Sequence, residues 1–365
     1  MEKEYQEYNE NQDPFAGLDE GLCQRCRRRS IDRSENPESQ LCRDCREELI
    51  KLRIPPYFYI IGAVALLLMV FTFSMSAGSF KNLESYANSG DLAEEGYVIS
   101  AMDNLLSLLE ENPDNKQAAI KLADIGMKYG YYDYAAFAID EYLAGKEVSD
   151  GQYEKLSGYI RKLDIYYDTQ ELNDEIWESV YSLVGDEEDV EAILETYSQE
   201  MSSYIGNTAY DQALLYYYMG YMSLDEETGN ACFEECLKAN PHYYDAYAQI
   251  ANSYRRSGDF ETARRKLEEA YRMNKEDYSV LRALATLALA EGRLDEGLDF
   301  AGQAYGIYPE GDYVIDTYIV ALAANGSMEQ AKALVEAYEE TGIFDEGLYA
   351  FLDGKITLED YYVGE

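Results

Sequence analysis

The chain has 365 residues and a formal net charge of -41, and it carries 37 tyrosines but only one histidine. This length allows two or three domains. Residues 1–55 hold 10 Lys and Arg against 13 Asp and Glu, whereas residues 82–365 hold 19 against 58. The acidic C-terminal part would repel phosphate backbones, which excludes nucleic-acid binding by that part. Its charge favours a basic partner or cations, or else it only keeps the domain soluble.

Residues 1–20 form an acidic N-terminal tail, and a four-cysteine pattern follows. Cys23 and Cys26 make one C-x2-C pair, and after fifteen residues Cys42 and Cys45 make a second. Two such turns can complete the tetrahedral thiolate shell that Zn²⁺ prefers in structural sites. Disulfides are the alternative, but we expect this segment to face a reducing cytoplasm, where thiols persist. The sequence therefore predicts one structural Zn²⁺, with no open position for catalysis.

The cysteine segment, residues 21–52, resembles zinc-ribbon and treble-clef knuckles, with the second pair leading into a short helix at 46–52. So short a segment cannot build a stable core alone, and metal binding would supply the missing folding free energy. Arg27, Arg28 and Arg29 follow the first pair. A basic cluster on such a knuckle can contact nucleic acid or anionic lipid headgroups, or it can remain solvated. Because the predicted membrane segment is close, lipid contact or solvation is favoured over nucleic-acid binding.

An uncharged apolar run from Tyr57 to Met75 predicts a transmembrane helix over residues 55–77. As a helix the run spans about 28 Å, which matches a hydrocarbon core of about 30 Å. A signal peptide is the alternative, but its apolar core is shorter and its charged leader is short. Basic residues cluster before the run and are scarce after it. The positive-inside bias therefore places the N-terminus in the cytoplasm and the C-terminal part outside.

Residues 78–345 carry a repeat of 34 residues, with an irregular stretch at 150–207. Three helix-ending pairs recur at this step: Asn240-Pro241, Asn274-Lys275 and Tyr308-Pro309. Small residues recur between them at matching positions, among them Gly258 and Gly292. Small residues let two antiparallel helices approach closely, Gly permits the turn, and Pro or Asn ends the second helix. The pattern predicts stacked helical hairpins.

This pattern resembles the tetratricopeptide repeat, most clearly from Tyr243 to Ile343. The resemblance implies an all-α fold, a right-handed α-solenoid in which each hairpin buries its apolar side only against neighbouring hairpins. It also implies a concave groove, lined by the first helix of each hairpin, that holds a protein or peptide partner. The residues at inward-facing positions are the candidate contacts: Asn252, Arg255, Arg282 and Thr286. Ordinary solvated helix residues are the alternative. We expect residues 346–365 to cap the solenoid or to fray.

The sequence offers no candidate catalytic residue. Its one histidine, His242, stands beside a proline, and there is no second histidine for a relay or a His-rich metal site. Gly-rich nucleotide loops and a G-x-S-x-G motif are absent from the sequence. Cys236 is expected to fill a hairpin core, and Trp177 is also expected to be a core residue. We therefore expect that the chain is not an enzyme.

These features together predict a single-pass membrane protein with an all-α, tetratricopeptide-like solenoid outside and a small zinc module inside. The leading hypothesis is an interaction scaffold, in which the outer domain binds a protein or peptide and the zinc module docks a cytoplasmic partner. The alternative is a one-pass sensor that signals through the zinc module. The arrangement looks like that of proteins of Gram-positive bacteria, so we expect the cell membrane of such a bacterium.

Overall fold

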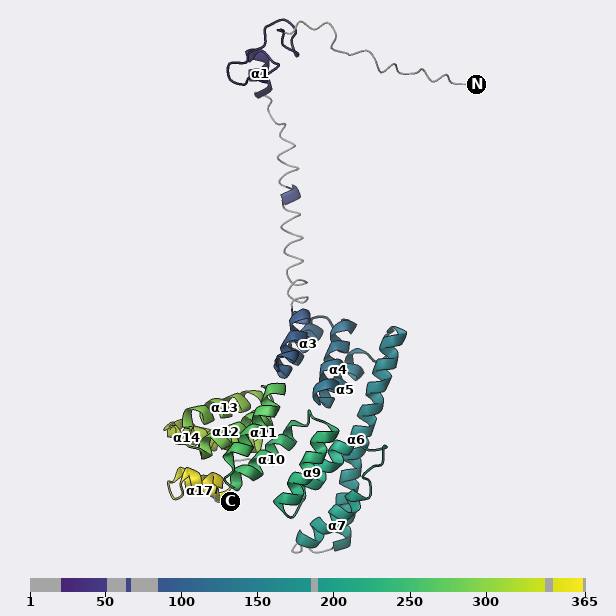
Figure 1. Ribbon diagram of the computed structural model, residues 1–365, viewed down its shortest axis with the longest axis vertical. Helices are drawn as coiled ribbons and strands as arrows, with labels where there is room; N and C mark the ends of the chain where they lie inside the picture. The colour runs from purple at the N-terminus through teal and green to yellow at the C-terminus, as the bar shows by residue number, and fades with distance from the viewer. Residues whose placement is uncertain (1–20, 51–63, 67–84, 185–189, 339–343, 364–365) are drawn as a thin grey trace, which may run out of the picture. The chain divides into compact units, whose positions relative to one another are not determined.

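The computed structural model describes residues 21–50, 64–66, 85–184, 190–338 and 344–363 (Figure 1). The chain divides into two compact units, Met1–Gly78 and Ser79–Glu365. Every regular element in the described residues is a helix, apart from one isolated antiparallel bridge between Leu22 and Ser30. The prediction of an all-α fold is confirmed.

The N-terminal unit holds the four cysteines and one short helix, α1 (Arg43–Ile50). The acidic tail of residues 1–20 lies outside the described residues. So does the predicted transmembrane helix over 55–77, except for residues 64–66, which are helical. In the part of the chain that the structure describes, we find no helix with the length and apolar character needed to span a membrane.

The C-terminal unit is a succession of antiparallel helical hairpins (Figure 1). Residues 85–94 are helical and precede α3 (Val98–Glu111). The later helices are α4 (Lys116–Tyr129), α5 (Tyr132–Tyr142), α6 (Asp150–Val184), α7 (Val190–Ser202), α8 (Gln212–Tyr221), α9 (Glu226–Ala239), α10 (Tyr244–Arg256), α11 (Phe260–Met273), α12 (Tyr278–Ala290), α13 (Leu294–Ile307), α14 (Asp312–Ala324), α15 (Met328–Tyr338), α16 (Glu346–Leu352) and α17 (Leu358–Val363). The predicted hairpin repeat is confirmed.

Four of the hairpin turns share one backbone conformation. In each of them a glycine with positive φ follows the first helix: Gly130, Gly258, Gly292 and Gly326. Their φ values lie between 75° and 82°, where a Cβ costs roughly 1 to 2 kcal/mol. After α12, the N–H of Arg293 donates to the carbonyl of Ala288 over 2.8 Å, which is the long bond of a Schellman motif. The sequence repeat is therefore a repeat of turn geometry.

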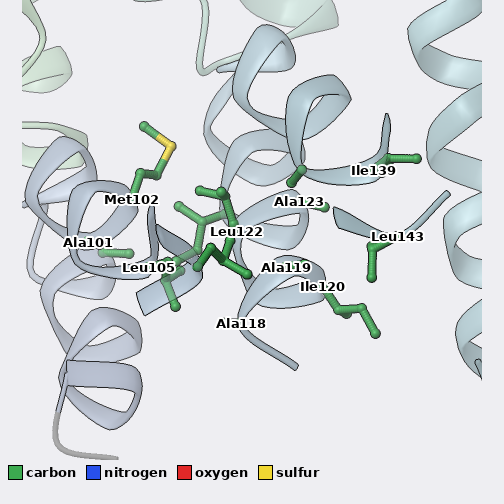
Figure 2. Close-up of a cluster of buried hydrophobic side chains, with 14 of the residues drawn as sticks. Ala101, Met102, Leu105, Ala118, Ala119, Ile120, Leu122, Ala123, Ile139 and Leu143 are labelled. Atoms are coloured by element: carbon green, nitrogen blue, oxygen red, sulfur yellow. The ribbon is translucent and has the colours of Figure 1, made fainter. Parts of the chain in front are cut away.

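Small residues let the two helices of a hairpin approach closely. At Gly297 in α13, an added Cβ would lie only 2.6 Å from the Cγ atom of Leu289 in α12. In the first hairpins, Leu105 of α3 and Leu122 of α4 are fully buried in one apolar cluster (Figure 2). At Gly297, a residue without a side chain thus leaves room for the leucine of the facing helix.

The stretch that is irregular in the sequence begins with α6, a helix of 35 residues. α7 packs against it, and their shared core includes Val180 and Tyr197. Trp177 packs edge-on against Tyr197, with ring centroids 5.5 Å apart, and is partly buried in this core as expected. One long helix takes the place of a regular repeat helix, which is why residues 150–207 depart from the 34-residue pattern.

The hairpins do not contact only their neighbours. The backbone N–H of Ser100, in α3, donates to the carboxylate of Glu276 over 2.9 Å. The hydroxyl of Tyr131, before α5, donates to the carboxylate of Asp277 over 2.9 Å. The expectation that each hairpin packs only on adjacent hairpins is therefore wrong for α3 to α5. The physical reason is that the turns of these hairpins carry polar groups that are satisfied by the loop before α12.

Candidate functional site

The four predicted zinc ligands lie together in the N-terminal unit. The Sγ atoms of Cys23, Cys26, Cys42 and Cys45 are all within 4.8 Å of one another. Those of Cys26 and Cys42 are 3.7 Å apart, far longer than a disulfide bond of about 2.05 Å. Four thiolates about 2.3 Å from one Zn²⁺ would stand about 3.8 Å apart at the corners of a tetrahedron. The geometry and the all-sulfur donor set therefore fit a closed structural zinc site.

Two pieces of local structure bring the cysteines together. In the first loop the N–H of Cys23 donates to the carbonyl of Arg29 over 2.7 Å, and Arg27 takes a left-handed φ of 51° directly after Cys26. The second pair stands at the start of α1, with Cys45 in its first turn. The first cysteine pair is thus held by a tight loop, and the second pair by the start of a helix.

The protein environment affects the thiols unequally. The backbone N–H of Cys26 lowers the pKa of Cys23 to about 6 by donating a hydrogen bond to its sulfur. Burial raises the pKa of Cys45 to about 12, and the neighbouring thiols add to that effect. A bound Zn²⁺ would be the largest local charge and would hold every ligand as the thiolate.

The arginines around the cysteines are engaged within the same module. A nitrogen of Arg46 lies 2.9 Å from a carboxylate oxygen of Asp32, and Arg29 pairs with Asp44. The exposed pair of Arg29 and Asp44 contributes less than about 1 kcal/mol. Of the run of three arginines, Arg29 is thus paired with an acidic residue of the same module.

The four candidate partner contacts lie on two first helices, α10 and α12. Asn252 and Arg255 of α10 are each 8% exposed, and Thr286 of α12 is 4% exposed. Arg282 is half-buried, and its guanidinium carbon lies 5.4 Å from the centroid of the Tyr313 ring on α14. Three of the four positions are therefore covered.

The C-terminal helix α17 lies on this surface, against the first helices α10, α12 and α14 (Figure 1). Arg255 donates a hydrogen bond to the backbone carbonyl of Tyr362, and its guanidinium carbon is 5.5 Å from the Tyr362 ring centroid. The hydroxyl of Tyr361 lies 2.9 Å from both carboxylate oxygens of Asp316. Helix α17 thus lies on the first helices that the sequence predicts to line the partner site.

The sequence reasoning missed the groove residues Asp316, Tyr361 and Tyr362. Burial and the charge of Asp316 raise the pKa of the Tyr361 hydroxyl, so it stays protonated and donates. One available signal was Thr357 followed three residues later by Asp360. In the structure the N–H of Thr357 donates to the Asp360 carboxylate over 2.8 Å, and the N–H of Asp360 donates to the Thr357 hydroxyl oxygen over 3.1 Å. Such a capping box predicts a helix start, but not where the helix docks.

Residues 244–287 cover α10, α11 and most of α12, and they match a known family model. That model is the tetratricopeptide repeat. No curated protein matches the chain at a significant level. Tetratricopeptide proteins are generally binding scaffolds rather than enzymes, and a helical repeat domain of this type is what the C-terminal unit contains.

Several solved structures are similar to this chain. A tetratricopeptide repeat protein from Parabacteroides merdae is 16% identical, with 77% of this chain and 88% of that chain covered and a TM-score of 0.30. The pilF protein of Pseudomonas aeruginosa is 14% identical, with 65% and 96% covered and a TM-score of 0.28. Both scores are below 0.5, so the family likeness rests on the repeat match and the hairpin geometry.

Other residues singled out in the sequence belong to the packing between tetratricopeptide-like hairpins. The Nδ1 atom of His242 lies 3.0 Å from the hydroxyl of Tyr244, and its ring packs edge-on against Tyr129. Burial and the nearby charge of Lys128 lower the pKa of His242. Cys236 is fully buried in a hairpin core, which confirms that expectation.

The tyrosine clusters also serve packing. Tyr217 of α8 lies with its ring centroid 4.7 Å from that of Tyr243, and its hydroxyl donates to Asp245 of α10. These contacts join two successive hairpins. These tyrosines are therefore part of the packing between hairpins.

Proposed function

We propose that this chain is a membrane-anchored interaction scaffold whose tetratricopeptide-like domain binds a protein or peptide partner. The observation that carries the proposal is the surface of the first helices α10, α12 and α14, where Arg255, Arg282 and Asp316 contact the aromatic side chains of Tyr362, Tyr313 and Tyr361. The strongly acidic outer surface at large favours basic partners. We further propose that the chain has no catalytic activity.

The partner proposal can be tested by placing a photo-crosslinking amino acid at Arg282 in the full-length chain expressed in cells. The matched control carries the same amino acid at Arg265, an exposed arginine on α11. A discrete crosslinked product from position 282 and not from position 265 supports groove binding. Equal products from both positions contradict it, as does the absence of a product from position 282 in a chain that ends at Gly354 and so lacks α17.

The cysteine module is proposed to hold one structural Zn²⁺ and to dock a second, cytoplasmic protein. The mutual Sγ distances and the burial of Cys23 support the metal. Zinc content of the purified full-length chain should be about one ion per chain. Cys42→Ser should lose most of it, and Cys232→Ser, a half-buried thiol in the repeat domain, should not. Equal zinc content in the two variants would contradict the site.

Membrane anchoring and orientation are proposed from the apolar run at 57–75 and the basic residues before it. The proposed location is the cell membrane of a Gram-positive bacterium, with the N-terminus in the cytoplasm. The test uses Ser257→Cys, an exposed turn position, in a chain whose Cys232 and Cys236 are replaced by serine and alanine. Labelling by a membrane-impermeant maleimide in intact cells supports the orientation. Labelling that appears only after lysis places the repeat domain inside and overturns it.

A further inference from the structure

The C-terminal helix α17 contacts more of the repeat domain than a terminal cap needs. A cap covers the apolar face of the last hairpin, and both C-terminal helices take part in this, since Leu348 of α16 and the two tyrosines of α17 are buried in one cluster with that hairpin. α17 continues past that hairpin and reaches Arg255 on α10, two hairpins earlier. It therefore lies across the first helices of three successive hairpins.

The helix is too short to be stable by itself. It has six residues, and isolated helices of fewer than about 12 residues are marginal in water. Its capping box between Thr357 and Asp360 sets where it begins. What holds it is the burial of two adjacent aromatic side chains, Tyr361 at 9% and Tyr362 at 6% exposed. The segment thus behaves as a short peptide ordered by the surface that it contacts.

The contacts have the character of ligand recognition. The Arg255 guanidinium stacks on the Tyr362 ring and also donates to the Tyr362 backbone carbonyl. Asp316 accepts the Tyr361 hydroxyl through both carboxylate oxygens, which selects tyrosine over phenylalanine at that position. Glu359 and Asp360 are exposed, and the Asp360 carboxylate accepts from Thr357 within the segment, so the contacts to the repeat domain are made by the two tyrosines.

We infer that α17 is an internal ligand that covers the partner site on the first helices α10, α12 and α14, and that the partner it excludes is a peptide with two adjacent aromatic residues. This inference rests on the proposed function, because it takes the groove to be the partner site.

The strength of the inhibition by α17 can be estimated because α17 is covalently linked to the surface that it covers. A segment held beside its own groove has an effective concentration on the order of 1 mM. If the free segment bound with a Kd of about 10 μM, the open fraction would be about 1%, and a competing peptide would bind about 100-fold more weakly than to an open groove. Partner binding is then limited by release of α17.

The test measures binding of a fluorescein-labelled peptide of residues 355–365 to the purified full-length chain by fluorescence anisotropy. The open variant carries Tyr361→Ala and Tyr362→Ala, and the matched control carries Tyr349→Ala, an exposed tyrosine on α16. A second open variant ends at Gly354 and lacks α17 altogether. Circular dichroism checks that each variant keeps its helix content.

We expect the open variants to bind the peptide at least tenfold more tightly than the wild type and the Tyr349→Ala control. Adding Arg255→Ala to the open variant should abolish this gain in affinity for the peptide. Equal binding by open and wild-type chains overturns the inference. So does loss of helix content in both open variants, because α17 would then be an integral part of the fold.

Photo-crosslinking from position 282 separates this inference from the proposed function. If the open variant binds the peptide but crosslinks no cellular protein, the internal ligand stands and the scaffold role fails. If the open variant and the wild type crosslink the same partner equally, the scaffold stands and the block fails.

Discussion

Replacing Tyr131 by phenylalanine should destabilise the repeat domain strongly, because this one hydroxyl joins α5 to the loop before α12. It donates to Oδ2 of Asp277 over 2.9 Å and accepts from Nδ2 of Asn274 over 2.6 Å. Asn274 is fully buried and Asp277 is 7% exposed. The substitution removes one oxygen atom and leaves the ring packing intact, so the polar contribution is isolated.

The cost follows from the two polar groups that lose a partner. Each buried group left without a hydrogen bond costs about 1 to 3 kcal/mol, and a carboxylate costs more than an amide. The expected loss in the free energy of unfolding is therefore about 3 to 5 kcal/mol. Asp277 keeps its bonds from the N–H groups of Ser279 and Val280, so the start of α12 should persist.

Tyr132→Phe is the matched control. The hydroxyl of Tyr132 contacts Asn240, which holds the position in the preceding repeat that Asn274 holds in the next one. The hydroxyl accepts from Asn240 at 3.4 Å, a long bond to a half-buried amide, so we expect a loss of about 1 kcal/mol or less. Urea unfolding of the full-length chain, followed by circular dichroism, gives both values. Losses that agree within about 0.5 kcal/mol would refute the assignment of Tyr131 as the stronger link.

Three further predictions concern single positions. Gly297→Ala should destabilise by about 1 to 3 kcal/mol, because its Cβ would meet Leu289. Gly306→Ala in the same helix meets no atom within 4 Å and should stabilise by about 0.5 to 1 kcal/mol; equal shifts in the thermal midpoint would contradict both. Folding lowers the pKa of His242 below its usual value of 6.5, so the unfolded chain binds more protons below that pH and His242 costs stability there. The stability of wild type relative to His242→Asn should thus fall as pH drops from about 7.5 to about 5, and a constant difference would contradict this. Arg27→Gly should raise zinc affinity in a competition assay with a chelator, since it removes a left-handed non-glycine residue that costs roughly 1 kcal/mol; unchanged affinity would show that Arg27 bears no strain.

The repeated part of the fold was predictable because its signals are local. Gly258 and Gly292 mark left-handed turns, and small residues such as Gly297 mark close helix contacts. Each of these requirements acts within one hairpin, so it leaves a pattern at a fixed spacing in the chain. The four cysteines were predictable for the same reason, since each C-x2-C turn positions its own two sulfurs.

The sequence alone therefore determined the helical hairpins, their turns and the grouping of Cys23 to Cys45. Only the tertiary structure decided that Tyr131 bonds to Asp277 and that Tyr362 stacks on Arg255. These pairs are separated by more than a hundred positions, and each residue is ordinary in its local context. Their meeting depends on how the long helix α6 and the stacked hairpins direct the chain in space. The repeat pattern determines each hairpin turn locally. Whether two residues more than a hundred positions apart come into contact depends on the packing of every helix between them.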